Sequence, residues 1–555
     1  MLAHRVSPQN LPKHYVLLHG LRKRQRDSIV FRNGNFRAVD LPSQNRHDCA
    51  QGEPDEIRKA SAASHCMNIP ATDKLPLRIK LGNGFGSVAY GVKDNGFTVL
   101  LLLFYNQVLG LDAATVGFIL LLALLGDALI DPLVGYWSDK THSRWGKRHP
   151  WMYAAILPMA AAWIMLWHPP AVEGQMLYLY LLLFAFLMRA AVSCYEIPAL
   201  SVVPALTADY DERTAITRWR FLFAWAGGLT MLLLAFAVFL VPTAEYPVGQ
   251  LNKDGYQLFG WVGAVFMVVA TSVAALTTHK RLARLPDVAP THLPLGETLR
   301  EIRKTLANRA YLILLGSSLF SFVTQGVAFS LTTYLLTYFW EMPQEGFLAY
   351  SLTLFAGVVG AFLLVGVLQS RLEKKTGAVI TGSLSLAITL MPYLLRAAGM
   401  FPENGDPALI PTLFTLVTIS NALAVAAMML GQSMAADVIE DSQSKTGKRE
   451  EGLFFSGYFF VQKCSQGLGI FIAGSIISIS GLPAKAVPGE VAEPVLTSLW
   501  MFYIAVLAAL SVCSIALISR FPITRAQHTA RLAQLGAVDP SKKGIEAPAA
   551  SPQGT

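Results

Sequence analysis

The residues that decide the fold are 113–148, which read AATVGFILLLALLGDALIDPLVGYWSDKTHSRWGKR. Their first part, 113–137, is an apolar run long enough to cross a bilayer as a helix, since a crossing takes about 20 residues. The acidic side chains in that run are Asp127 and Asp131, and the turn that follows carries four Lys and Arg residues. An apolar run that ends in a basic turn predicts a transmembrane helix whose C-terminal end faces the cytoplasm.

The composition of the 555-residue chain extends this prediction to the whole protein. Hydrophobic residues make up 53% and charged residues 15%, against roughly 25% charged in an ordinary soluble domain. This balance argues against a water-soluble enzyme, a disordered chain, collagen and a disulfide-rich secreted domain. Apolar runs that predict twelve helices fall at 82–109, 113–137, 150–168, 176–205, 216–241, 258–278, 309–340, 347–369, 377–397, 408–436, 452–481 and 494–519.

The loops between these runs predict the orientation. The loops after the even-numbered runs hold nineteen Lys and Arg residues, whereas the odd-numbered loops hold Lys253, Arg396 and Lys485. Because basic loops stay in the cytoplasm, we expect a multi-pass protein of the plasma (inner) membrane with both termini cytoplasmic.

The net charge of +9 does not indicate a nucleic-acid partner. Residues 1–80 hold 14 Lys and Arg and 7 Asp and Glu, which is +7 of the total. We expect this segment to be a basic tail, solvated or held near anionic lipid headgroups, and Met67 is a candidate for the true start. The remaining predicted parts are a first six-helix bundle (81–279), a cytoplasmic central loop (280–308), a second six-helix bundle (309–519) and a cytoplasmic tail (520–555).

The two predicted bundles look internally repeated. Gly135 and Asp139 end the second run before the basic turn with Arg144, Gly146 and Lys147, and a similar glycine and basic turn follows the eighth run at 366–377. Duplicated halves with a site between them are typical of alternating-access transporters. We therefore expect the residues of this turn to act in gating at the cytoplasmic loop.

Charged residues inside the apolar runs are the candidate functional groups, because each costs about 2.5–3.5 kcal/mol at the bilayer centre on insertion scales. Asp127 and Asp131 lie four residues apart and hence on one helix face. Two carboxylates so close should share a proton or hold a cation. The other intramembrane charges are Lys93, Asp94, Arg189, Glu196, Arg218, Arg220 and Lys463. Structural salt bridges between helices are the alternative to a functional role. If the charges do function, Asp127 and Asp131 would take a coupling cation, whereas Asp94, Glu196 and Arg220 would hydrogen-bond a polar solute.

Several motifs resemble one family. Tyr-Gly-Val-Lys-Asp at 90–94, Gly-Asp-Ala-Leu-Ile-Asp-Pro-Leu-Val-Gly at 126–135, Ser-Arg-Trp-Gly-Lys-Arg-His-Pro-Trp at 143–151 and Glu-Ile-Pro at 196–198 resemble the glycoside–pentoside–hexuronide:cation symporters. These form the melibiose-permease branch of the major facilitator superfamily, and the resemblance spans about 82–520. It implies an all-α membrane protein with the major facilitator fold, twelve transmembrane helices in two six-helix halves.

The resemblance also implies roles for individual residues. It places Na⁺ or H⁺ at Asp127 and Asp131, which makes these two the metal ligands if sodium is coupled, and Ser193 and Lys463 complete or modulate that site. It places the sugar at Asp94, Glu196 and Arg220, with Lys93 beside them.

The chain also departs from the melibiose-permease branch. Leu124 replaces an arginine, which removes a positive charge and should raise the carboxylates' affinity for a cation. Glu196 replaces an aspartate, and Leu200 replaces a sugar-stacking tryptophan. Aromatic residues at 458–460 stand where helix 11 is polar in that branch. They serve core packing, or they form a pocket for an aglycone or acyl chain.

The leading prediction is a monomeric cation-coupled symporter of a sugar or glycoside that works by alternating access and needs no cofactor beyond the coupling ion, Na⁺ or H⁺. A related carrier of an amphiphile such as a lysolipid is the alternative, and a non-transporting receptor is a weaker one. An enzyme is not expected, because the sequence contains no nucleophile–base pair, metal-ligand spacing or phosphate-binding loop.

Overall fold

The computed structural model describes residues 75–207, 209–282, 308–446, 451–524 and 527. The described helices belong to one compact unit, residues 71–555. The candidate start Met67, most of the central loop and most of the C-terminal tail lie outside the described residues. Within the described part, eleven helices are long and apolar enough to span a membrane, and no strand is assigned.

The first predicted helix is not among those eleven. Residues 77–108 are a chain of short segments: α3 (Leu77–Phe85), α4 (Val88–Asn95), π-helical η3 (Gly96–Leu100), α5 (Leu101–Leu103) and π-helical η4 (Phe104–Val108). A π-turn inserts a residue into the helix and is frequent at functional sites. The first π-turn begins at Gly96, two residues after Asp94.

The remaining helices follow their apolar runs closely, and several continue into polar residues at their ends. In the first half they are α6 (Ala113–Lys140), α7 (His149–Trp167), α8 (Gln175–Leu206), α9 (Tyr210–Leu234) with η5 (Ala235–Phe239), and α10 (Lys253–Leu282). In the second half they are α12 (Arg309–Tyr334) with η7 (Leu335–Phe339), α13 (Gln344–Arg371), α14 (Lys374–Ala397), α15 (Leu409–Thr446), α16 (Glu451–Ser480) and α17 (Glu493–Ile518).

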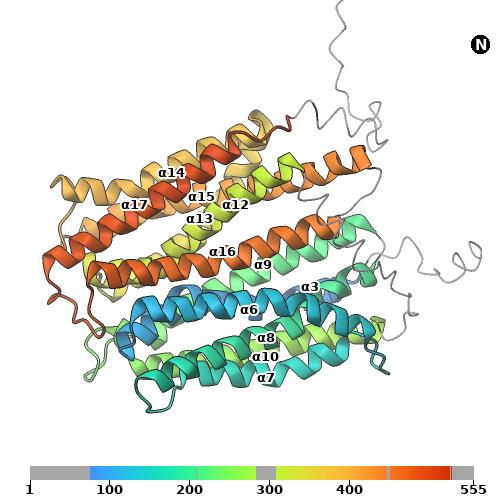
Figure 1. Ribbon diagram of the computed structural model, residues 1–555, viewed down its shortest axis with the longest axis horizontal. Coiled ribbons are helices and arrows are strands. Elements are labelled where there is room, and N and C mark those ends of the chain that lie inside the picture. Colours follow the sequence, from blue (N-terminus) through green and yellow to red (C-terminus); the bar gives the residue numbers. More distant parts are fainter. Residues whose placement is uncertain (1–74, 208, 283–307, 447–450, 525–526, 528–555) are drawn as a thin grey trace, which may run out of the picture. The chain divides into compact units, whose positions relative to one another are not determined.

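The packing follows the predicted two sets of six. In the first set α7 packs on α8 and α10, α6 packs on α8, and α4 packs on α9; in the second set α15 packs on α13 and α14, and α12 packs on α16 and α17. Figure 1 shows the first set in blue and green below the second set in yellow to red. The two sets meet where α16 packs along α6.

Glycines allow α16 to approach α6 closely. A Cβ added to Gly467 would lie 3.0 Å from the Cβ of Leu124, and one added to Gly117 would lie 3.0 Å from the Ile470 oxygen. Small residues of this kind let membrane helices approach backbone to backbone. The close approach brings Lys463, one turn before Gly467 on α16, to the acidic face of α6.

Candidate functional site

Asp127 and Asp131, the acidic residues in the middle of α6, differ in exposure. Side-chain exposure is 5% for Asp127 and 21% for Asp131. Pro132 lies inside α6, and because proline has no N–H it leaves the Ala128 carbonyl without its helical donor. This locally opened backbone adjoins the pair of carboxylates.

Ser193 of α8 lies between the two carboxylates. Its Oγ is 2.5 Å from Asp127 Oδ1 and 2.6 Å from Asp131 Oδ1. A serine hydroxyl has one hydrogen and can donate to one of these oxygens at a time. The second short O···O contact therefore needs a further positive species, either a proton on one carboxyl group or a bound cation.

Two basic side chains complete this acid cluster, which consists of Asp127, Asp131, Ser193, Arg189 and Lys463. Lys463 Nζ of α16 lies 2.5 Å from Asp131 Oδ2 and 3.2 Å from Asp127 Oδ2. Arg189 Nη2 of α8 lies 3.2 Å from Asp127 Oδ2. With the acids ionised and the bases protonated, the cluster has two negative and two positive charges, which balance within the protein.

Arg189 changes the expectation attached to Leu124. The sequence predicts that a leucine at position 124 removes a positive charge from the carboxylates. In the structure Arg189 of α8 supplies a positive charge at Asp127, which acts against the predicted gain in cation affinity. Its guanidinium is 97% buried and stacks on the Phe97 ring at 5.2 Å, and its Nε has no hydrogen-bond partner among the described residues.

Glu196 and Arg220 form an ion pair outside the acid cluster. Arg220 of α9 donates to Glu196 Oε1 of α8, and its Nη1 lies 3.4 Å from Asn83 Oδ1 of α3. Asn83 is buried, and its Nδ2 has no partner among the described residues. Glu196 lies three residues after Ser193, nearly one helical turn along α8. The Glu196–Arg220 pair therefore extends the polar surface of α8 beyond the cluster.

Lys93 and Asp94 are not joined to that ion pair. Lys93 Nζ is buried 3.8 Å from Asp94 Oδ1 and lies 4.2 Å from the centre of the Tyr90 ring. Gln466 Nε2 of α16 is 3.4 Å from both Asp94 oxygens. Among the described residues, no hydrogen bond or ion pair links Asp94 to Glu196 or Arg220. The residues expected to hold the sugar thus form two groups. Gln466 belongs to the group with Lys93 and Asp94, and Asn83 belongs to the group with Glu196 and Arg220.

The turn after α6 contains the expected gating residues in a defined geometry. Gly146 has φ +83°, which favours glycine, and its N–H donates to the Ser143 carbonyl at 2.9 Å. Asp139 Oδ1 lies 3.6 Å from Arg148 Nη2, and Arg148 also donates to the Ser201 carbonyl of α8. The remaining expected residues of this turn are Gly135, whose carbonyl accepts from Ser138, Arg144, which lies over the Trp145 ring, and Lys147.

At the other end of the helices, bonds join the two sets of six. Gln107 of η4 accepts from the Tyr338 hydroxyl of η7 at 3.0 Å and from the Ala486 N–H at 2.9 Å, and it donates to the Pro483 carbonyl at 3.2 Å. The Tyr334 hydroxyl donates to Asn106 Oδ1 at 3.1 Å. We call Asn106, Gln107, Tyr334 and Tyr338 the latch. By contrast, the ion pairs Asp139–Arg148 and Lys374–Asp437, at the end with the basic turn, each stay within one set.

The aromatic residues of α16 have separate environments. Tyr458 is buried and packs edge-on against Phe322 of α12 at 5.7 Å, as core packing predicts. Phe459 and Phe460 are exposed, and so is Leu200 of α8. The position of the stacking tryptophan on α8 is therefore held by an exposed aliphatic side chain, Leu200.

Sequence reasoning missed Arg189, Gln466 and the latch as parts of the site. Arg189 was recognisable as an intramembrane charge, but its partner depends on how α8 is rotated. The signal for the latch was the pair of amides at 106–107 at the end of an otherwise apolar run.

Comparison with known proteins agrees with this architecture. The sequence model of a family described as MFS/sugar transport protein matches residues 82–525. An uncharacterized symporter of Synechocystis sp. (strain ATCC 27184 / PCC 6803 / Kazusa) is 25% identical and covers 83% of this chain and 96% of its own length. The isoprimeverose transporter of Lactiplantibacillus pentosus is 22% identical, covering 77% and 85%.

A solved structure is also similar in fold. The inward-facing, unoccupied structure of a bacterial homologue of the human lysosomal transporter Spinster aligns with a TM-score of 0.57 at 14% identity. It covers 84% of this chain and 98% of its own.

Proposed function

The chain belongs to the MFS/sugar transport protein family, and from this premise we propose that it is a symporter that couples entry of a proton to entry of a sugar or glycoside. As a member of this family it is a membrane transporter and not an enzyme. The relatives named as symporters, and the relative named as an isoprimeverose transporter, support a sugar as the solute. They do not favour the lysolipid carrier or the receptor.

The observation that carries the proposal is the position of Lys463. It comes from the second set of helices and forms ion pairs with Asp127 and Asp131 of the first set. The charge state of Asp127 and Asp131 is thereby tied to the contact between the two sets. Alternating access moves these sets relative to each other, so binding of a cation at the acids changes the same contact that must change during transport.

A proton suits the acid cluster better than sodium does. The carboxylate oxygens of Asp127 and Asp131 already have Lys463, Arg189 or Ser193 as partners. A hard metal cation takes several oxygen ligands at once, so sodium would compete with these partners for the same oxygens. Sodium would have to displace Lys463 from its bridging position. A proton on Asp131 weakens only the Lys463–Asp131 pair and supplies the second hydrogen that the Ser193 contacts require.

The proposed solute site runs along α8 from the acid cluster to the Glu196–Arg220 pair. Arg220 can donate hydrogen bonds to the solute, and Glu196 and Asp94 can accept them. Gln466 Nε2, now bonded to Asp94, and Asn83 Nδ2, which has no partner among the described residues, are further donors. This mixture of donors and acceptors suits adjacent hydroxyl groups. Leu200 in place of an aromatic ring argues for a solute that does not depend on stacking on α8.

The latch supports a form closed at the outer side and open at the cytoplasmic side. Bonds between the sets gather at the latch, and the basic turns lie at the opposite end of the helices. We propose that these turns and the termini are cytoplasmic and that the protein lies in the inner membrane, as basic loops predict.

Uptake into proteoliposomes tests the proposal. Solutes are first selected by thermal shift of the purified protein against pentoses, hexoses, glycosides and hexuronates, at pH 5.5 and 7.5, with and without sodium. A selected radiolabelled solute should accumulate when an inward proton gradient is imposed. An uncoupler, which collapses the proton gradient, should abolish this accumulation. Accumulation driven by a sodium gradient alone would contradict the choice of proton. Asp127→Asn should still bind the solute but should not concentrate it.

A further inference from the structure

The second set of six helices encloses a cavity that the proposed transport site does not use. Its volume is about 330 Å³, which is in the range of cavities that hold small molecules. It lies among α12, α14, α15 and α17. None of the residues of the acid cluster, and neither Asp94, Glu196 nor Arg220, lines it.

The cavity lining is uncharged. It contains no Asp, Glu, Lys, Arg or His, and beside its apolar residues it holds ten Ser and Thr, Gln325 and Asn421. Because a buried charge needs a partner charge or strong hydrogen bonds, such a lining disfavours anionic and cationic ligands. A neutral ligand with a large apolar part suits it.

Most of the hydroxyls are already engaged between helices. Ser317 and Ser321 of α12 bond Ser514 of α17 at 3.0 and 2.7 Å, and Ser385 and Thr389 of α14 bond Ser420 of α15. These groups hold the helices together, as polar side chains often do within membranes. Their presence alone does not require a ligand.

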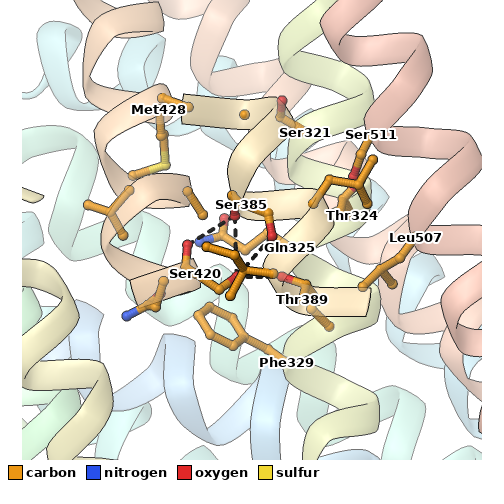
Figure 2. Close-up of a pocket in the computed structure, with 18 of the residues that line it drawn as sticks. Ser321, Thr324, Gln325, Phe329, Ser385, Thr389, Ser420, Met428, Leu507 and Ser511 are labelled. Atoms are coloured by element: carbon orange, nitrogen blue, oxygen red, sulfur yellow. Dashed lines mark hydrogen bonds between the residues drawn. The ribbon is translucent and has the colours of Figure 1, made fainter. Parts of the chain in front are cut away.

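Gln325 and Ser511 differ from those hydroxyls. Neither side chain has a hydrogen-bond partner among the described residues, and each is partly exposed to the cavity. Figure 2 shows Gln325 in the middle of the pocket, between Ser385 and Thr389 on one side and Thr324 on the other. A glutamine amide offers two donors and one acceptor. A membrane interior offers no bulk water to satisfy these groups.

The cavity adjoins the outer surface of the helix bundle. A groove between α14 and α17 is lined by Leu386 and Ile515, which also line the cavity, together with residues such as Leu390, Ala387 and Val512. Figure 1 shows α14 and α17 at the edge of the second set, away from the first set. This groove is apolar, and Val512 is exposed, so a ligand would arrive from the hydrocarbon of the bilayer.

From these observations we propose that the cavity binds a neutral bilayer amphiphile, with an uncharged hydroxyl or ester head at Gln325 and Ser511 and its acyl chain passing between α14 and α17. The aromatic residues at one end of the cavity, Trp340, Tyr393 and Tyr503, are of the kind that gathers at the membrane interface. This site is separate from the proposed transport site, and its occupation does not depend on the choice of solute or coupling ion.

Photocrosslinking tests the proposal on the purified full chain in phosphatidylcholine nanodiscs. The probe is a diacylglycerol that carries a diazirine in one acyl chain, and a phosphatidylglycerol with the same chain is the charged comparison. We expect the neutral probe to label peptides of α12 and α17 around Gln325 and Ser511 at least tenfold more than the charged one.

Two variants and a matched control separate this site from general lipid contact. Ser511→Phe fills the cavity and should reduce the labelling tenfold, whereas Leu363→Phe, on the exposed surface of α13, should leave it unchanged. Gln325→Leu keeps the size of the side chain and removes the amide. It should lower the apparent affinity for the neutral probe about fivefold, as expected for the loss of one hydrogen bond of about 1 kcal/mol. Wild-type labelling in both variants, or equal labelling by the charged probe, would overturn the proposal.

Discussion

Arg189 Nη2 lies 3.2 Å from Asp127 Oδ2, and this ion pair joins α8 to α6 about halfway along both helices. Both side chains are buried, so the pair is held in a medium of low dielectric constant. Removal of one partner from a buried ion pair leaves an uncompensated charge and is strongly destabilising, by about 3–5 kcal/mol. Arg189 therefore sets how strongly Asp127 attracts any other cation.

We predict that Arg189→Gln increases the apparent affinity for the coupling cation by on the order of tenfold, which corresponds to about 1.4 kcal/mol. The carboxylate of Asp127 would then depend on Lys463 and the coupling cation alone. The measurement is the dependence of solute uptake on pH and on sodium concentration in proteoliposomes. Arg189→Lys keeps the charge and is the control, and it should resemble the wild type. An unchanged cation dependence in Arg189→Gln would show that the pair is purely structural.

Lys463 is the partner that joins the two sets of helices, so its replacement tests the coupling itself. Lys463→Gln removes both ion pairs with α6, and we expect it to abolish concentrative uptake while solute exchange across the membrane continues. The removal also leaves Asp131 unpaired and should lower the melting temperature. Asp131→Asn restores the charge balance in this background, and the double variant should be more stable than Lys463→Gln. If the two changes lower the melting temperature additively, the contact has no energetic role.

The spans and the acid pair on α6 could be predicted because they depend on local sequence. A run of apolar residues fixes a helix, and a separation of four residues places Asp127 and Asp131 on one face whatever the rest of the chain does. The family resemblance added Ser193 and Lys463, and the structure brings both to that face. Eleven of the twelve predicted spans correspond to helices long and apolar enough to cross a membrane; the first, which carries Lys93 and Asp94, is helical but is not among them.

The partners of the other charges could not be predicted, because they depend on the rotation and depth of separate helices. The sequence shows Arg189 and Asp94 as intramembrane charges, but only the packing of α8 on α6 and the position of α16 decide that Arg189 meets Asp127 and that Asp94 meets Gln466. The same holds for Leu124. From the sequence, leucine at position 124 means the loss of a positive charge. The charge that compensates for it belongs to Arg189, 65 residues further along the chain.

The latch predicts how the outer side opens. Gln107 is buried and makes three hydrogen bonds across the two sets of helices, and all three must break for an outward-open form. Gln107→Leu should therefore shift the population toward that form, since the replaced side chain leaves the Tyr338 hydroxyl and the Ala486 N–H without their partner.

Labelling from the outside measures this shift. A cysteine introduced at Thr98, which is buried beneath the latch, should react with a membrane-impermeant maleimide faster in Gln107→Leu than in the parent. Tyr338→Phe removes the hydroxyl that bonds Gln107 and the Ala486 carbonyl but leaves the Gln107 bonds to Ala486 N–H and Pro483, so it should show a smaller increase. Equal rates in the parent and both variants would mean that the latch does not limit opening.

Acid should weaken the contact between the start of α6 and the end of α16. Asp112 precedes the α6 span and caps it, and it accepts from Thr115 N–H and Oγ1 at 2.8 Å and from Ser478 Oγ of α16 at 2.9 Å. Burial raises the pKa of this carboxyl group, but the hydrogen bonds from Thr115 and Ser478 outweigh it, so its pKa lies below the ordinary value. A carboxyl group whose pKa is lowered by folding stabilises the folded state above its unfolded pKa of about 3.9, and this stabilisation disappears as the pH falls through the lowered pKa.

We therefore predict that Asp112→Ala lowers the melting temperature at pH 7, by an amount that reflects the loss of an N-cap worth about 1 kcal/mol, and that the difference from the wild type shrinks toward pH 3. Asp112→Asn keeps a capping oxygen without the charge and should lie between the two at pH 7. Melting temperatures of the purified protein between pH 3 and pH 7 provide the measurement. A difference between Asp112→Ala and the wild type that stays constant over this range would mean that the cap acts through its geometry and not through the charge of Asp112.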